Sequence, residues 1–217
     1  MPVAKSSGQD YGVIPAGVQH AVCYQVIDIG TQPAFGNFPP RRKVKIVWEL
    51  PNEKIMVQAK PGQAPGAIEM PRAISKDYTL STDSKANLRK DLEAWRGKPF
   101  TTEEAQGFEV GKLIGANCQL LVVHKPSKDG SKTYANVGAV MPLTKGAVKL
   151  KPENPTLVWD IPLEGAITFP DSMPEWMQNL IKNSEEYQDR VNPHRRPPTD
   201  KELENRGGPA PDEDVPF

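Results

Sequence analysis

The stretch RRKVKIVWEL at residues 41–50 alternates charged and apolar side chains, a pattern typical of a β-strand. Arg41, Lys43 and Lys45 share one face of that strand. The opposite face carries the apolar side chains of Val44, Ile46, Trp48 and Leu50. We therefore expect one face of the strand to lie in the core and the other to carry cations. The alternation favours a core position for Trp48 over a base-stacking one.

Further strands are predicted on both sides of this stretch. They are short runs rich in Val, Ile, Thr and Tyr, bounded by Gly, Pro, Asp or Ser. The five predicted strands cover residues 17–30, 41–50, 72–81, 112–125 and 132–143, with 52–60 as a candidate extension of the second strand beyond Pro51.

A helix is predicted between the third and fourth strands. Leu88, Leu92 and Trp95 have the i, i+4, i+7 spacing of one helix face, and Gly97 and Pro99 follow as stop signals. The element order is then three strands, one helix and two strands. That is the order of an OB-fold, a five-stranded Greek-key barrel, so we expect a mainly β protein with this fold.

The composition changes after residue 151, where proline begins to interrupt every apolar run. A short amphipathic helix is predicted over residues 174–190, with Trp176 or Met177 on its apolar face. We expect it to dock on the barrel or on a second subunit. The expected segments are an OB-fold domain (1–151), a proline-rich wrap with this helix (152–191) and a disordered tail with an acidic end (192–217).

The charges are divided between the two parts of the chain. Residues 1–151 contain 21 Lys and Arg against 13 Asp and Glu, a net charge of +8, and residues 152–217 contain 6 against 14, a net charge of −8. A basic body favours a polyanionic partner, although the same segregation also arises on ordinary solvated surfaces.

The sequence contains no signature of an enzyme, such as a phosphate-binding glycine loop or a nucleophile motif. Its three histidines are scattered, so we expect no catalytic residue, no metal and no cofactor. Cys23 and Cys118 lie in apolar runs and suit a reducing compartment. No run is long enough to span a membrane and no signal peptide is evident, so a cytoplasmic location without a membrane partner is expected.

Cations and aromatic side chains occur together on the predicted second and third strands, in the loop before the second strand, and around the turn between the last two strands. Extended strands space same-face cations by about 6.5 Å, close to the spacing of nucleotides in an extended single strand. Cations would meet phosphates, and exposed rings would stack on bases. The candidate DNA-binding residues are Phe35, Phe38, Arg41, Arg42, Lys43, Lys45, Arg72, Lys76, Tyr78, Lys125, Lys128, Lys132 and Tyr134.

The last six residues, DEDVPF, resemble the acidic tip of bacterial single-stranded DNA-binding proteins. In that family the tip docks on replication, recombination and repair proteins. The resemblance implies that partner proteins bind here to Asp212, Glu213, Asp214, Val215, Pro216 and Phe217.

The body is more similar to phage single-stranded DNA-binding proteins with an OB-fold, in stretches such as RKVKIVWELP and MPEWMQNLIKNSEEY. This resemblance implies a protein that coats single-stranded DNA in phage replication, recombination or repair, in the host cytoplasm. It leaves a monomer, a dimer or another homo-oligomer open. The alternative function is that of a replication or recombination adaptor whose barrel binds protein or double-stranded DNA.

Overall fold

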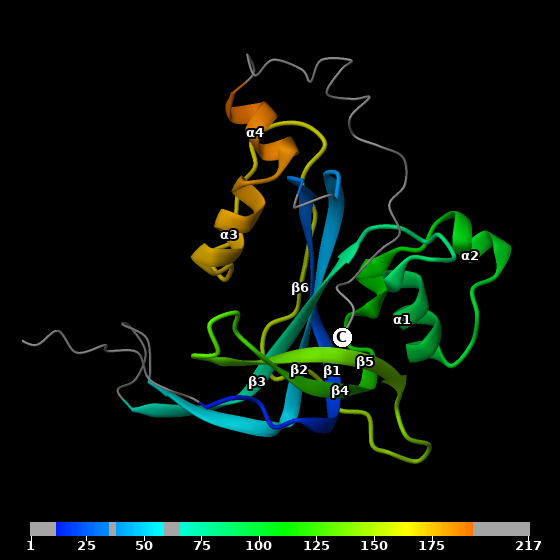
Figure 1. Cartoon of the computed structure of the whole chain (residues 1–217), viewed down its shortest axis with the longest axis vertical. Helices are drawn as coiled ribbons and strands as arrows, with labels where there is room; N and C mark the ends of the chain where they lie inside the picture. Colours follow the sequence, from blue (N-terminus) through cyan, green and yellow to red (C-terminus); the bar gives the residue numbers. More distant parts are fainter. Residues whose placement is uncertain (1–11, 35–37, 59–65, 193–217) are drawn as a thin grey trace, which may run out of the picture.

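The computed structural model describes residues 12–34, 38–58 and 66–192. Within these ranges the protein is mainly β, with one six-stranded sheet and several short helices (Figure 1). The strands are β1 (Gly17–Gln32), β2 (Arg41–Gln58), β3 (Ala67–Thr79), β4 (Asn117–Pro126), β5 (Thr133–Pro142) and β6 (Leu157–Trp159). The helices are α1 (Asn87–Arg96), α2 (Thr102–Gln106), the 3-10 helix η1 (Val110–Leu113), α3 (Glu175–Lys182) and α4 (Glu185–Val191).

The sheet has the strand order β3-β2-β1-β4-β5, and all of these neighbours are antiparallel. Among the described residues no hydrogen-bonded ladder joins β3 to β5, so the sheet is open and the predicted closed barrel is not formed. Helix α1 packs against both of these outer strands. Its buried side chains Leu88, Leu92 and Trp95 belong to the apolar cluster that it shares with the sheet.

Strand β1 has different neighbours along its length. Residues 17–22 pair with β4, whereas residues 25–27 pair with β6 in a parallel ladder. Bulges between Cys23 and Gln25 and between Asp28 and Gly30 shift its register against β2, and bulges bend and twist a strand locally. The second half of β1 therefore separates from β4, stays paired with β2 and extends toward the C-terminal helices.

Two apolar clusters stabilise these two parts. The larger cluster lies between the five antiparallel strands and α1, and there Trp48 is fully buried with its ring centroid 5.7 Å from that of Trp95. The core position predicted for Trp48 is confirmed. The smaller cluster consists of Ile27, Ile29, Ile161, Met173, Met177 and Ile181. Each such buried side chain contributes about 1.5–3 kcal/mol to folding.

The predicted helix over residues 174–190 is two helices. Helix α3 ends at Lys182, and the side chain of Ser184 begins α4 by accepting a hydrogen bond from the Tyr187 amide at 3.3 Å. This local capping bond competes with continuation of the first helix. Figure 1 shows α3 and α4 on one side of the diagonal strand β3 and α1 and α2 on the other.

The proline-rich segment after β5 is attached to the sheet through a buried carboxylate. Glu49 of β2 is fully buried and accepts hydrogen bonds from the amides of Glu153 and Asn154 at 2.8 and 2.7 Å. Burial, with a smaller effect of the Glu49 charge, raises the pKa of the nearby Tyr24 hydroxyl to about 12. The segment therefore crosses the outer face of β2 before it forms β6.

Candidate nucleic-acid interface

Lys43 and Lys45 of β2 face the opposite side of the sheet from Lys76 of β3. Lys45 lies directly opposite Asp77 in the antiparallel ladder, and Ile46 lies opposite Lys76. Directly opposite residues point to the same side, so Lys76 shares the side of the core residue Ile46, and Lys45 points the other way. The expected continuous basic surface across these two strands is therefore not formed.

The ring of Tyr78 is not available for base stacking, contrary to the expectation from sequence. It is 2 % exposed and belongs to the larger apolar cluster. Its hydroxyl donates a hydrogen bond to Asp91 of α1 at 2.7 Å, and Lys76 Nζ lies 2.9 Å from the same carboxylate oxygen. Both β3 side chains thus hold α1 on the sheet, and Lys76 has its charge neutralised there.

Two of the predicted β2 cations are also engaged inside the protein. Lys45 is buried and forms an ion pair with Asp77. Arg42 Nη2 lies 2.6 Å from Oδ2 of the buried Asp28, whose other oxygen accepts a hydrogen bond from the Gly30 amide. The Asp28 hydrogen bond raises the pKa of the Arg42 guanidinium. Both pairs stabilise the part of the sheet that carries the C-terminal helices.

The hairpin between β4 and β5 presents cations that are not neutralised in this way. Lys125, Lys128 and Lys132 are exposed, and no carboxylate of the described residues lies within 4.0 Å of their ammonium groups. Tyr134 is 53 % exposed and lies directly across the ladder from Lys125. The hairpin therefore combines three available cations with one available aromatic ring.

The turn of this hairpin is ordered by its own hydrogen bonds. The carboxylate of Asp129 accepts from the Ser127 hydroxyl and from the amide and hydroxyl of Ser131. These bonds, that of Ser127 first, lower the pKa of Asp129 to about 2. Gly130 adopts a φ of +69°, which suits glycine, and Ser127 and Lys132 exchange two further bonds at 2.8 and 3.0 Å. The lysines are consequently displayed on a defined turn.

The remaining predicted contacts belong to β2, to β3 and to the segment before β2, or lie outside the described residues. Lys43 is half-buried on the outer face of β2, and within the described ranges no carboxylate reaches it. Arg41 and Phe38 are half-buried at the start of β2, and Arg72 donates to the Gly12 carbonyl at 2.9 Å. Phe35 and the acidic tip, Asp212 to Phe217, lie outside the described residues.

Sequence reasoning left open whether Trp176 or Met177 faces the core. Met177 is buried in the smaller cluster, whereas Trp176 is 56 % exposed and its ring lies over Lys45 Nζ, 5.7 Å from the ring centroid. Trp176 was not among the predicted DNA contacts. The available signal was its position directly before Met177, because adjacent helical residues are rotated by about 100°.

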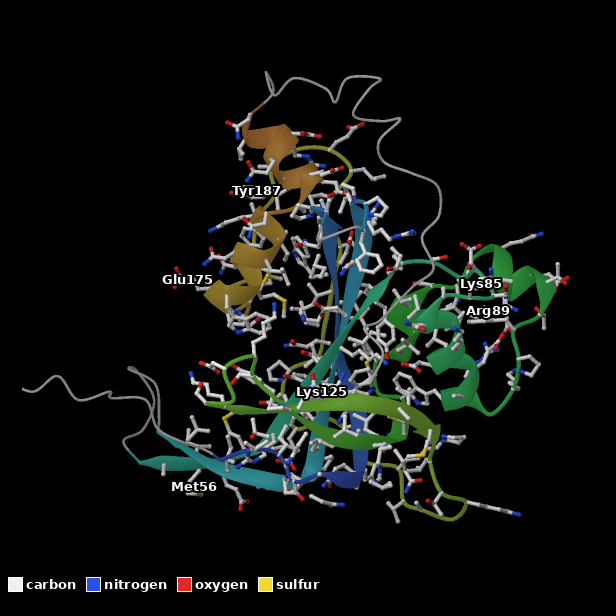
Figure 2. All side chains as sticks on the ribbon, viewed as in Figure 1. Met56, Lys85, Arg89, Lys125, Glu175 and Tyr187 are labelled. Carbon is white, nitrogen blue, oxygen red and sulfur yellow. The ribbon has the colours of Figure 1, made fainter. Side chains whose placement is uncertain are left out.

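In the view of Figure 2, Lys125 lies below Glu175, where α3 begins, and above Met56 near the end of β2. In the part of the chain that the structure describes, no group of three or more His, Cys, Asp or Glu could hold a metal ion. None of the described helices has the length and apolarity needed to cross a membrane.

Comparison with known proteins identifies no relative: no protein family, no curated protein and no solved structure matches the chain.

Proposed function

We propose that this protein binds single-stranded DNA without catalysing a reaction on it, and that its sheet is an open variant of the OB-fold. The order β3-β2-β1-β4-β5, with α1 between β3 and β4 along the chain, supports the fold proposal. The similarity of the sequence to phage single-stranded DNA-binding proteins supports the function.

The proposal rests mainly on the β4–β5 hairpin. OB-folds use the loop between the last two strands to grip oligonucleotides. Here that hairpin presents Lys125, Lys128 and Lys132, none of which has a described carboxylate within 4.0 Å of its ammonium group, beside the exposed ring of Tyr134. A sequence-tolerant single-strand binder requires cations that neutralise phosphates and a ring on which a base stacks.

We further propose that the protein coats single-stranded DNA during phage replication, recombination or repair, and that the tip from Asp212 to Phe217 recruits partner proteins. The phage role rests on the resemblance of stretches such as RKVKIVWELP to phage proteins, and the recruitment of partners on the resemblance of DEDVPF to bacterial acidic tips.

The deciding experiment is a fluorescence-anisotropy titration of labelled oligo-dT and of a duplex of equal length at two salt concentrations. We expect tighter binding of oligo-dT and a steep decrease of affinity with salt, because phosphate binding releases counterions. Weak binding of oligo-dT, or preference for the duplex, would overturn the proposal in favour of an adaptor.

A triple variant tests the hairpin itself. Replacing Lys125, Lys128 and Lys132 with Ala should reduce the slope of log affinity against log salt by about 2, because each phosphate contact to a single strand contributes about 0.7. The matched control replaces Lys145, Lys149 and Lys151, three exposed lysines of the loop after β5, and should leave the slope nearly unchanged. Equal losses in both variants would show that the hairpin has no special part in binding.

A further inference from the structure

Trp176 is an exposed aromatic side chain on a helix that is otherwise well anchored. Its neighbour Met177 is 1 % exposed and Ile181 is fully buried, both in the smaller apolar cluster with β1. The ring of Trp176 itself is 56 % exposed. A large ring left in water gains little folding energy, so folding alone gives no reason for tryptophan at this position.

The ring is also held over a cation of β2. Lys45 Nζ lies 5.7 Å from the ring centroid and forms an ion pair with Asp77. A cation over an indole face is attracted to it by about 0.5–2 kcal/mol. Lys45 is buried, and α3 is anchored through Met177 and Ile181. The ring therefore has a defined position above the outer face of β2.

The face of β2 beneath the ring carries one cation, Lys43, that has no ion-pair partner among the described residues. Lys45 compensates the charge of Asp77, and Lys43 lies two residues further along the same face without a carboxylate of the described chain in reach. An apolar partner protein would have to desolvate Lys43, at a cost in free energy. A nucleotide would place its base on the ring and its phosphate near Lys43.

We propose that Trp176 is a base-stacking platform for single-stranded nucleic acid, so that the C-terminal helix α3 forms part of the binding surface together with Lys43 of β2. This inference rests on the proposed function. It adds a contact outside the five-stranded body. It also places the path of the nucleic-acid strand on the β2 side of the sheet that faces α3.

The test compares Trp176→Ala, Trp176→Phe and the matched control Leu163→Ala in oligo-dT titrations. Base stacking contributes about 1–3 kcal/mol, so Trp176→Ala should weaken binding by about 5- to 150-fold. Trp176→Phe should retain most of the affinity because it keeps a ring. Leu163 is 91 % exposed, and its replacement removes exposed apolar surface without removing a ring, so it should have no effect.

Tryptophan fluorescence provides a second measurement. Oligo-dT should quench the wild-type emission through Trp176, because Trp48 and Trp95 are buried and Trp159 stacks on Phe169. Trp176→Ala should lose most of this quenching while unfolding at the wild-type temperature. A wild-type protein that does not bind oligo-dT would contradict the proposed function. Unchanged affinity and unchanged quenching in Trp176→Ala would contradict this inference alone. So would a Trp176→Ala variant whose native mass changes while its affinity for oligo-dT does not.

Discussion

At Gly30 the backbone of β1 lies close to the start of α4. It has a φ of +71°, and a Cβ atom added there would lie 2.5 Å from Ser184 Cβ and 2.7 Å from both Glu186 Oε2 and Ile161 Cδ1. These distances are too short for non-bonded atoms. We expect Gly30→Ala to lower the free energy of unfolding by about 2–4 kcal/mol, from backbone strain and overpacking together.

The control for this prediction is Gly115→Ala. Gly115 has a similar φ of +77°, but nothing lies within 4 Å of the added Cβ. Urea denaturation should show a loss of only about 1–2 kcal/mol, the strain of the left-handed backbone. Equal losses in the two variants would mean that the close packing at Gly30 is relieved without cost.

Glu49 offers a second prediction at the scale of one residue. Its buried carboxylate accepts two amide hydrogen bonds from the segment that leads to β6. In Glu49→Gln one oxygen becomes an NH₂ group, which cannot accept, so one buried amide loses its partner. The free energy of unfolding should fall by about 1–3 kcal/mol. The neighbouring Glu53→Gln, in a partly exposed side chain, should change it little, and an unaffected Glu49→Gln would contradict the assigned role.

Helix α2 provides a prediction at the scale of an element. Glu104 accepts two hydrogen bonds from Arg96 at 2.8 and 3.0 Å and one from the Thr101 amide, which completes a capping box. These bonds, those of Arg96 first, lower the pKa of Glu104 from 4.5 to about 2. A lowered pKa stabilises the folded state above pH 4.5, and that contribution is lost as the pH falls toward 2.

We therefore expect the stability difference between the wild type and Glu104→Gln to be constant above about pH 4.5 and to shrink between pH 4.5 and 2. Denaturation curves across this range give the measurement. A difference that does not change with pH would show that the carboxylate charge is not what holds α2.

The elements also show what sequence can and cannot predict here. Alternation and helix spacing are local properties, so the strands, α1 and the core position of Trp48 follow from them. Which face of β3 points outward depends instead on its register with β2. In that register Lys45 lies opposite Asp77, and no local pattern in either strand encodes it. The side of Lys76 and the burial of Tyr78 could therefore not be predicted.

The bulges in β1 limited prediction in the same way. The extra residues near Cys23 and Asp28 turn the second half of the strand toward β6 and the C-terminal helices. A single sequence shows residues 17–30 as one continuous strand, because a bulge changes pairing without changing composition. The cation–ring contact of Lys45 with Trp176 depends on this geometry, and it joins residues far apart in the chain.

At the scale of the whole molecule, the division of charge predicts the behaviour of a truncated protein. Removing residues 212–217 takes away three carboxylate side chains but no residue of either apolar cluster. We expect unchanged thermal unfolding and unchanged or slightly higher affinity for oligo-dT, because a tethered polyanion that competes for the cations is shortened. Binding of partner proteins should be lost. A large loss of DNA affinity would contradict this account.

The first half of β1 pairs with β4 and the second half with β6, and this division has a consequence during synthesis on the ribosome. The Thr31 side chain and amide bind Glu186, which follows 155 residues later in the chain. At about 5–20 residues per second, synthesis of that interval takes roughly 8–30 seconds. During that time the first half of β1 can pair with β4 while Ile27 and Ile29 still lack α3 and α4. We expect the nascent chain to expose this apolar strand end as a transient binding site for chaperones, which closes only when the last helix emerges.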